Sequence, residues 1–309
     1  MSARVSDRGR SVRSRSERSY FGWKAAIVTL LASGATARRM FGLVEPIGLI
    51  PYVTGEPAGA LMALGLRTYW DTYFAGRAAP LGRAPAEVVH AVFYNFAPGE
   101  AARHIPRVWD IITPEAALAA RHRGCVIALR RLLGGLAGAP GLARTAGLLA
   151  KAAISPPVTG RPLYAGLRAL PVPKEPVGLL WHAANLLREH RGDGHVAALV
   201  ANRIGGTQSH VLHALSQGMP AQKFGRLCHL PHAQLAAVID GLRGRGLIGA
   251  DGWLTTQGRA VKQRIEALTD DLAAPPYDAL EPSELDQLIT GLQPLAATLT
   301  AALDAADPS

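Results

Sequence analysis

Apolar residues recur at helical spacing along most of the chain and predict a mostly α-helical protein. One large apolar face, for example, is formed by aromatic residues three and four positions apart: Tyr69, Trp70, Tyr73 and Phe74. The same spacing predicts helices over residues 36–49, 57–64, 99–109, 114–133, 177–189 and 207–216. With 309 residues, the chain is long enough to build two modest domains from such helices.

A proline-rich stretch divides the chain into two helical modules. Residues 156–176 hold six prolines, and proline interrupts helices because it has no N–H to donate and its ring crowds the preceding turn. We therefore predict a connector there that runs along the surface. The expected domains are a disordered basic tail over 1–35, a helical domain over 36–155, the connector over 156–176, and a helical plus winged-helix domain over 177–309.

A weak internal repeat supports this two-module organisation. Glu45 and Gly48 have counterparts in Glu189 and Gly192, and two segments of equal length each run from a glycine to a proline. The identities are few, so chance explains them as well as a duplication does. If the repeat is real, residues 36–155 contain a degenerate copy of the winged helix that has lost its hairpin.

Residues 218–272 predict a winged helix-turn-helix. A short helix over 221–228 and a longer helix over 232–245 are separated by a turn, and the longer helix has one apolar face. Asp251-Gly252 is a hairpin turn signal between short apolar segments. We therefore expect a short β-hairpin, the wing, before a final helix over 256–272.

The order of motifs in this segment resembles the winged helix of the MarR-type regulators. The motifs are Arg-Gly-Leu-Ile at 245–248 and Trp-Leu-Thr-Thr-Gln-Gly-Arg-Ala at 253–260. The wider chain is similar to an uncharacterised actinobacterial family of helix-turn-helix proteins, some of them labelled SalK-like. The matching stretches are 37–46, 73–82, 93–96, 181–182, 188–195 and 271–276. The resemblance implies a winged-helix fold and supplies no established activity.

The net charge of +10 comes mostly from the beginning of the chain. Residues 1–39 carry nine Arg or Lys and two acidic residues, whereas the other 270 residues carry 24 basic and 21 acidic ones. Residues 176–309, which include the predicted winged helix, have a net charge of −3, with 10 basic and 13 acidic residues. That sign is unfavourable for DNA binding, because neutralisation of phosphate supplies most non-specific affinity.

The second helix of a helix-turn-helix enters the major groove, so its exposed side chains are the candidates for DNA contact. The predicted DNA-binding residues are His232, Gln234, Arg243 and Arg245. Gln234 can pair with adenine and Arg243 can contact phosphate. The predicted wing tip holds no Arg or Lys, so both DNA binding and a purely structural role for the module remain open.

Charged and histidine side chains are crowded just before residue 196. The candidates for acid–base catalysis are Glu189, His190, Asp193 and His195. The candidates for ligand binding are His182, Arg188, Arg191, Tyr94 and Asn95. The alternative interpretation is a capped helix end, in which residues 190–195 form a tight turn because two glycines flank an aspartate.

No motif predicts a metal site or a cofactor. Cys125 and Cys228 fit no zinc or redox spacing, and neither H-E-x-x-H, G-x-S-x-G, a phosphate-binding loop nor a dinucleotide fingerprint is present. We expect no metal and no cofactor, and two cysteines without disulfide spacing suit a reducing cytoplasm. After the basic tail, no apolar run reaches the roughly 20 residues of a membrane helix.

Two functions from different classes follow from these patterns. The leading hypothesis is a cytoplasmic, ligand-responsive winged-helix transcriptional regulator whose partners are DNA and a small molecule, with a homodimer as its candidate assembly. The alternative is a small-molecule enzyme or binding protein of secondary metabolism, in which the cluster from Glu189 to His195 surrounds the ligand and the winged helix is purely structural. A regulator requires a basic face over the second helix, whereas the alternative requires a deep pocket beside the cluster.

Overall fold

The protein is mostly helical, as the apolar spacing predicts. The computed structural model describes residues 34–225, 227 and 230–306. Its helices are one over residues 34–48, α2 (Ile50–Val53), α3 (Gly55–Met62), α4 (Tyr69–Ala78), α5 (Ala86–Val92), α6 (Val108–Ile111), α7 (Pro114–Leu133), α8 (Leu142–Ala153), α9 (Pro162–Arg168), α10 (Pro176–Ala201), α11 (Gly206–Ser216), α12 (His232–Gly244), α13 (Thr256–Leu272) and α14 (Pro282–Ala306). The first helix begins inside the predicted tail, of which residues 1–33 lie outside the described part.

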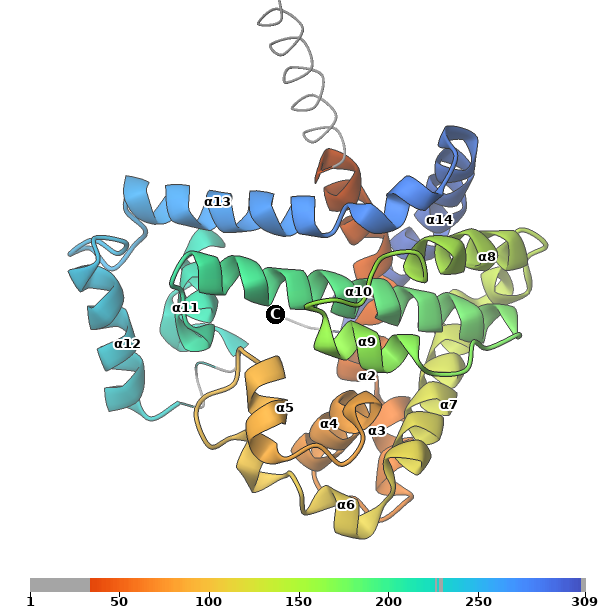
Figure 1. Ribbon diagram of the computed structural model, residues 1–309, viewed down its shortest axis with the longest axis horizontal. Helices are drawn as coiled ribbons and strands as arrows, with labels where there is room; N and C mark the ends of the chain where they lie inside the picture. Colours follow the sequence, from red (N-terminus) through yellow and green to blue (C-terminus); the bar gives the residue numbers. More distant parts are fainter. Residues whose placement is uncertain (1–33, 226, 228–229, 307–309) are drawn as a thin grey trace, which may run out of the picture.

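The long helix α10 crosses the middle of the molecule, with α13 alongside it (Figure 1). Its N-terminus is capped by the Glu175 carboxylate, which accepts hydrogen bonds from two backbone N–H groups of the first turn. The predicted turn at 190–195 is wrong, because these residues continue α10 without a break. Gly194 is needed for close packing instead: a Cβ there would lie 2.5 Å from Nη1 of Arg161.

Three clusters of buried apolar side chains hold the helices together. One lies between the helix 34–48, α7, α8, α10 and α14, the second between α3, α4, α5 and α7, and the third between the end of α10, α11, α12 and α13. α10 therefore contributes to the first and third clusters. The C-terminal helix α14 packs against α7 and α8, so elements on both sides of the predicted connector share one core.

The segment over 218–272, for which a winged helix-turn-helix is predicted, contains α12 and α13. Helix α12 ends one residue before the predicted boundary. The predicted short helix over 221–228 is replaced by a 3₁₀ turn at Ala221–Lys223, and Arg226, Cys228 and His229 lie outside the described residues.

The predicted β-hairpin is wrong for the described residues, which form a single antiparallel bridge between Ile248 and Leu254. Pairing ends on one side at Gly246, whose φ is +70°, a conformation that no ladder continues. It ends on the other at Thr255, which already caps α13 by accepting a hydrogen bond from the N–H of Gly258. Too few residues remain between these two points to build strands.

Within the described residues, no single helix is long and apolar enough to cross a membrane. Two helical stretches, Pro114–Gly138 and Leu142–Ala153, satisfy that test only when taken together, and they are bent by 119° relative to each other.

Candidate functional site

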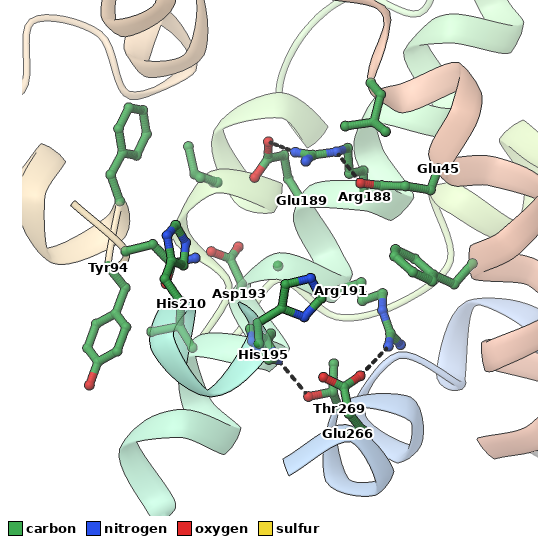
Figure 2. A pocket seen from close by; sticks show the side chains of 18 of the residues that line it. Glu45, Tyr94, Arg188, Glu189, Arg191, Asp193, His195, His210, Glu266 and Thr269 are labelled. Atoms are coloured by element: carbon green, nitrogen blue, oxygen red, sulfur yellow. Dashed lines mark hydrogen bonds and ion pairs between the residues drawn. The ribbon is translucent and has the colours of Figure 1, made fainter. Parts of the chain in front are cut away.

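A cavity of about 1020 Å³ lies among the helix 34–48, α4, the loop over 92–96, α10, α11 and α13. Its volume is at the upper end of the range for small-molecule sites in proteins. Side chains from these elements point toward a common space (Figure 2). α10 supplies Arg188, Arg191 and His195 among others, because residues three, four and seven positions apart lie on one face of a helix.

One wall of the cavity is a buried network of arginines and glutamates. The Arg77 guanidinium donates to both oxygens of Glu189, with Nε 3.2 Å from Oε1 and Nη2 2.9 Å from Oε2. Arg188 donates from Nε to Glu45 at 3.2 Å and from Nη1 to Glu189 at 3.4 Å. Burial alone would raise the pKa of Glu189, but Arg77 and Arg188 lower it to about 2. Glu189 is therefore an ion-pair centre and not a proton donor near neutral pH.

Glu45 behaves differently from Glu189. Burial raises the pKa of Glu45, and the charge of Glu189 raises it further, although Arg188 opposes both effects. Its Oε2 is buried without a hydrogen-bond partner among the described residues. Glu45 and Glu189, the two glutamates matched by the weak sequence repeat, thus meet at Arg188.

A second ionic cluster links the helix 34–48 and α10 to α13. Arg38 donates to Glu266 at 2.7 Å and to Asp270 at 2.9 Å, and Arg191 lies 2.8 Å from Asp270. Lys262 also pairs with Glu266. These pairs attach the helix that follows the helix-turn-helix to the body of the protein across the cavity.

All four arginines that line the cavity also lie over an aromatic ring, with Arg38 5.9 Å from the centroid of Phe41 and the other three closer. The distance from the guanidinium carbon to the ring centroid is 4.4 Å for Arg77 over Phe93, 5.0 Å for Arg188 over Tyr52 and 4.4 Å for Arg191 over Phe41. Such contacts restrict the guanidinium plane. The arginines are therefore held on two sides, by carboxylates and by rings.

Asp193 and His195 lie on the part of α10 that faces the cavity. The Oδ2 atom of Asp193 accepts a hydrogen bond from the backbone N–H of Tyr164 at 3.0 Å. Burial, with a contribution from Glu189, raises the pKa of Asp193 to about 7. His195 contacts the Thr269 hydroxyl through Nδ1 at 2.9 Å, and burial lowers its pKa to about 4, so the imidazole is neutral near pH 7.

The structure brings most of the predicted site residues together. The cavity is lined by Glu189, Asp193, His195, Arg188, Arg191, Tyr94 and Asn95. His190 and His182 are buried on other faces of α10: the His190 ring lies 5.0 Å from the Tyr164 ring, and neither histidine lines the cavity. Burial lowers the pKa of His190 to about 3 and that of His182 to about 4, which favours a packing role for both.

Several lining residues were missed by the sequence analysis. They include Arg77, Arg38, Tyr52, Glu266 and Asp270. Nothing near them in the sequence marks them, because each lies on an amphipathic helix where a charged or aromatic residue is ordinary. Among the described residues, no group of three or more His, Cys, Asp or Glu side chains is arranged to hold a metal ion.

The predicted DNA-binding residues lie on α12 or directly after it, and α12 lies at one edge of the molecule (Figure 1). His232, Gln234, Arg243 and Arg245 are all exposed. Arg243 pairs with Asp240 at 2.9 Å. Arg245 is partly engaged, because its Nη1 donates to the carbonyl of Arg203 at 2.7 Å.

We expect Asp193→Asn to stabilise the protein in a pH-dependent way. Because the folded-state pKa of Asp193 is raised above its ordinary value, wild-type stability falls as the pH rises through the window from about 4 to about 7. Above about pH 7 the variant should be more stable by about 2 kcal/mol, less than the full shift because the amide is itself buried. Urea unfolding of the wild type and the variant at about pH 8 and pH 4 measures this. The same difference in free energy of unfolding between the two proteins at both pH values would contradict the prediction.

The comparisons with known proteins identify one family. A family model described as a helix-turn-helix family matches residues 37–306. No curated protein and no solved structure matches the chain significantly. The match confirms the predicted helix-turn-helix relationship, and it extends over nearly all the described residues.

Proposed function

The chain belongs to this helix-turn-helix family, and on that premise we propose that it is a DNA-binding transcriptional regulator that responds to a small molecule in the cavity. The observation that carries the proposal is the exposure of α12. Leu235 and Leu242 anchor this helix on the third apolar cluster, while His232, Gln234 and Arg243 are exposed. Figure 1 shows α12 at one edge of the molecule, away from α7 and α8. A helix held in this way is available to a major groove.

The segment after α12 supports a wing of the MarR type as part of the proposal. The N–H of Gly249 donates to the carbonyl of Trp253 at 2.8 Å, and the N–H of Thr255 donates to that of Leu247 at 3.1 Å, on either side of the single bridge. Kinship with the SalK-like actinobacterial proteins, a cytoplasmic location and a homodimer belong to the same proposal.

Responsiveness to a ligand is supported by two helices that line the cavity and also hold α12 in place. α11 and α13 both line the cavity and both pack around the third apolar cluster that holds α12. His210 and His213, two cavity residues on α11, also contact the ring of Phe224, at centroid distances of 5.8 Å and 5.4 Å. Phe224 precedes α12 by only a few residues. A ligand that displaces α11 or α13 would therefore shift α12.

A gel-shift titration against the DNA upstream of the protein's own gene, repeated at several salt concentrations, tests the proposal. Specific binding should weaken steeply with salt, because phosphate contacts release counterions. No binding at low salt, by a protein shown to be folded, would reject it.

Two α12 variants should separate base reading from phosphate contact. Gln234→Ala is expected to reduce affinity for the specific site by about tenfold and leave non-specific binding unchanged. Arg243→Ala should weaken both and reduce the salt slope by about one; the pair with Asp240 has to open for this contact to form. Arg123→Ala, an exposed arginine on α7, is the control. Equal effects of Arg243→Ala and Arg123→Ala would contradict a phosphate contact by α12.

A second candidate function is an enzyme or small-molecule binding protein in which the helix-turn-helix is structural. The observation that favours it is the enclosed carboxyl of Asp193, whose pKa of about 7 suits proton transfer near neutral pH. This candidate would be supported if the folded protein bound no DNA and chemically converted a small molecule that it binds.

A further inference from the structure

The positively charged side chains of the cavity are already paired with protein carboxylates. Each of the five lining Arg and Lys side chains lies within ion-pair distance of a carboxylate: Arg38, Arg77, Arg188, Arg191 and Lys262. The four arginines among them also lie over aromatic rings, as described above. An anionic ligand would have to displace a protein carboxylate from whichever arginine it approached. The cavity is therefore poorly suited to select an anion.

Asp193 is the lining carboxylate without an ion pair among the described residues. It is only 6% exposed. One oxygen accepts the Tyr164 N–H, whereas Oδ1 has no hydrogen-bond partner within the described part and is not sealed off from the cavity. Figure 2 places this carboxylate in the middle of the lining side chains. Asp193 thus presents one open acceptor atom to the cavity.

Among the described residues, no cation lies within ion-pair distance of Asp193. Arg161, before α9, and Arg77, on α4, act on it through space and lower its pKa, while burial and Glu189, on α10, raise it. The Arg161 guanidinium instead donates hydrogen bonds to the backbone carbonyls of His190 and Leu272. A buried carboxylate without a partner is unfavourable. A positively charged group on a ligand would supply the missing counter-ion of Asp193.

The rest of the cavity near Asp193 offers apolar surface. The cavity is lined by Val92 at the end of α5, Phe96 in the loop that follows, Leu163 on α9 and Val196 on α10. Together with the volume of about 1020 Å³, these side chains fit an organic body of drug-like size.

We propose that the cavity binds an organic amine, whose protonated nitrogen donates a hydrogen bond to Oδ1 of Asp193 and whose largely apolar body packs against the neighbouring side chains. The inference rests on the ligand-responsive part of the proposed function and names the chemical class of its ligand. The fixed arginine–carboxylate pairs discriminate against acids, and the open carboxylate discriminates against neutral molecules of the same shape.

Three probes with one carbon skeleton test this inference: 4-phenylbutylamine, 4-phenylbutanol and 4-phenylbutyrate. Each is titrated calorimetrically into the full chain, without DNA, near pH 8. The amine should bind at least about tenfold more tightly than the alcohol, because its hydrogen bond to Asp193 is charge-assisted. The carboxylate should bind most weakly.

The variant Asp193→Asn keeps the shape and the acceptor for the Tyr164 N–H but removes the charge. It should weaken amine binding by about tenfold or more and leave alcohol binding unchanged. Asp110→Asn, at an exposed position on α6, should bind all three probes as the wild type does. Circular dichroism establishes that each variant is folded.

The affinity for the amine should also depend on pH in one direction. The amine stays protonated throughout, whereas Asp193, whose pKa lies at about 7, has to lose its proton to pair with it. Affinity should therefore fall by about 30-fold between about pH 8 and pH 5.5 in the wild type and stay nearly constant in Asp193→Asn. Binding of the alcohol should not follow this profile.

Three results would overturn the inference: tightest binding by 4-phenylbutyrate, equal amine affinities of the wild type and Asp193→Asn, or no amine binding up to its solubility limit. Because no DNA is present, these titrations are independent of the gel-shift test. If the chain binds DNA but does not prefer the amine, only the proposed ligand class is wrong. If it binds the amine but no DNA, only the proposed regulator function is wrong.

Discussion

Glu189→Gln is expected to lower the free energy of unfolding by about 3–5 kcal/mol, the range typical for breaking a buried ion pair from one side. Glu189 is 2% exposed and pairs with both Arg77 and Arg188. Glutamine keeps the size of the side chain but cannot neutralise either guanidinium. Among the described residues, Arg77 would then have no carboxylate partner and Arg188 would keep only Glu45. Urea unfolding monitored by circular dichroism near pH 7 measures the loss.

The control for this prediction is an ion pair with similar geometry at the surface. Glu56 lies 2.6 Å from Arg131, whose side chain is 57% exposed. Glu56→Gln should therefore cost less than about 1 kcal/mol. Similar losses for the two variants would mean that the Glu189 network is solvated and does not hold the cavity wall in place.

Gly206→Ala should destabilise the protein by about 3 kcal/mol, because the first turn of α11 lies directly against the loop over 92–96. A Cβ at Gly206 would overlap the carbonyl oxygen of Tyr94 and lie 2.7 Å from its carbonyl carbon and 2.9 Å from Cα of Asn95. These are backbone atoms, so only movement of α11 or of the loop relieves the overlap. That movement would alter a wall of the cavity and the support of α12.

The matched control is Gly241→Ala on α12. Nothing lies within 4 Å of a Cβ at that position, and alanine is favoured over glycine inside a helix by up to about 1 kcal/mol. The two glycine variants should therefore change the free energy of unfolding in opposite directions. A stabilising effect of Gly206→Ala would show that α11 and the loop are not in tight contact.

The local predictions that hold up best are those made by short-range patterns. The bounds of α12 follow from its apolar spacing and from Pro231 before it, and the cluster near residue 190 was identified from the density of charged residues. The turn at 190–195 failed because glycine is ambiguous: Gly192 and Gly194 permit a turn, but they also permit close packing of a buried helix. The hairpin failed because Gly246 and the cap at Thr255 leave no room for strands.

Helical content and the helix α12 could thus be predicted from the sequence, because both depend on neighbours a few positions apart. The division at residues 156–176 stays a prediction. The cavity was decided by packing: Glu189 meets Arg77 across 112 positions of sequence, and Arg188 meets Glu45 across 143. No local pattern specifies such pairs, because the free energy that orients a buried charge comes from the partners that folding brings to it. Folding likewise leaves Asp193 without a counter-ion among the residues that the structure describes.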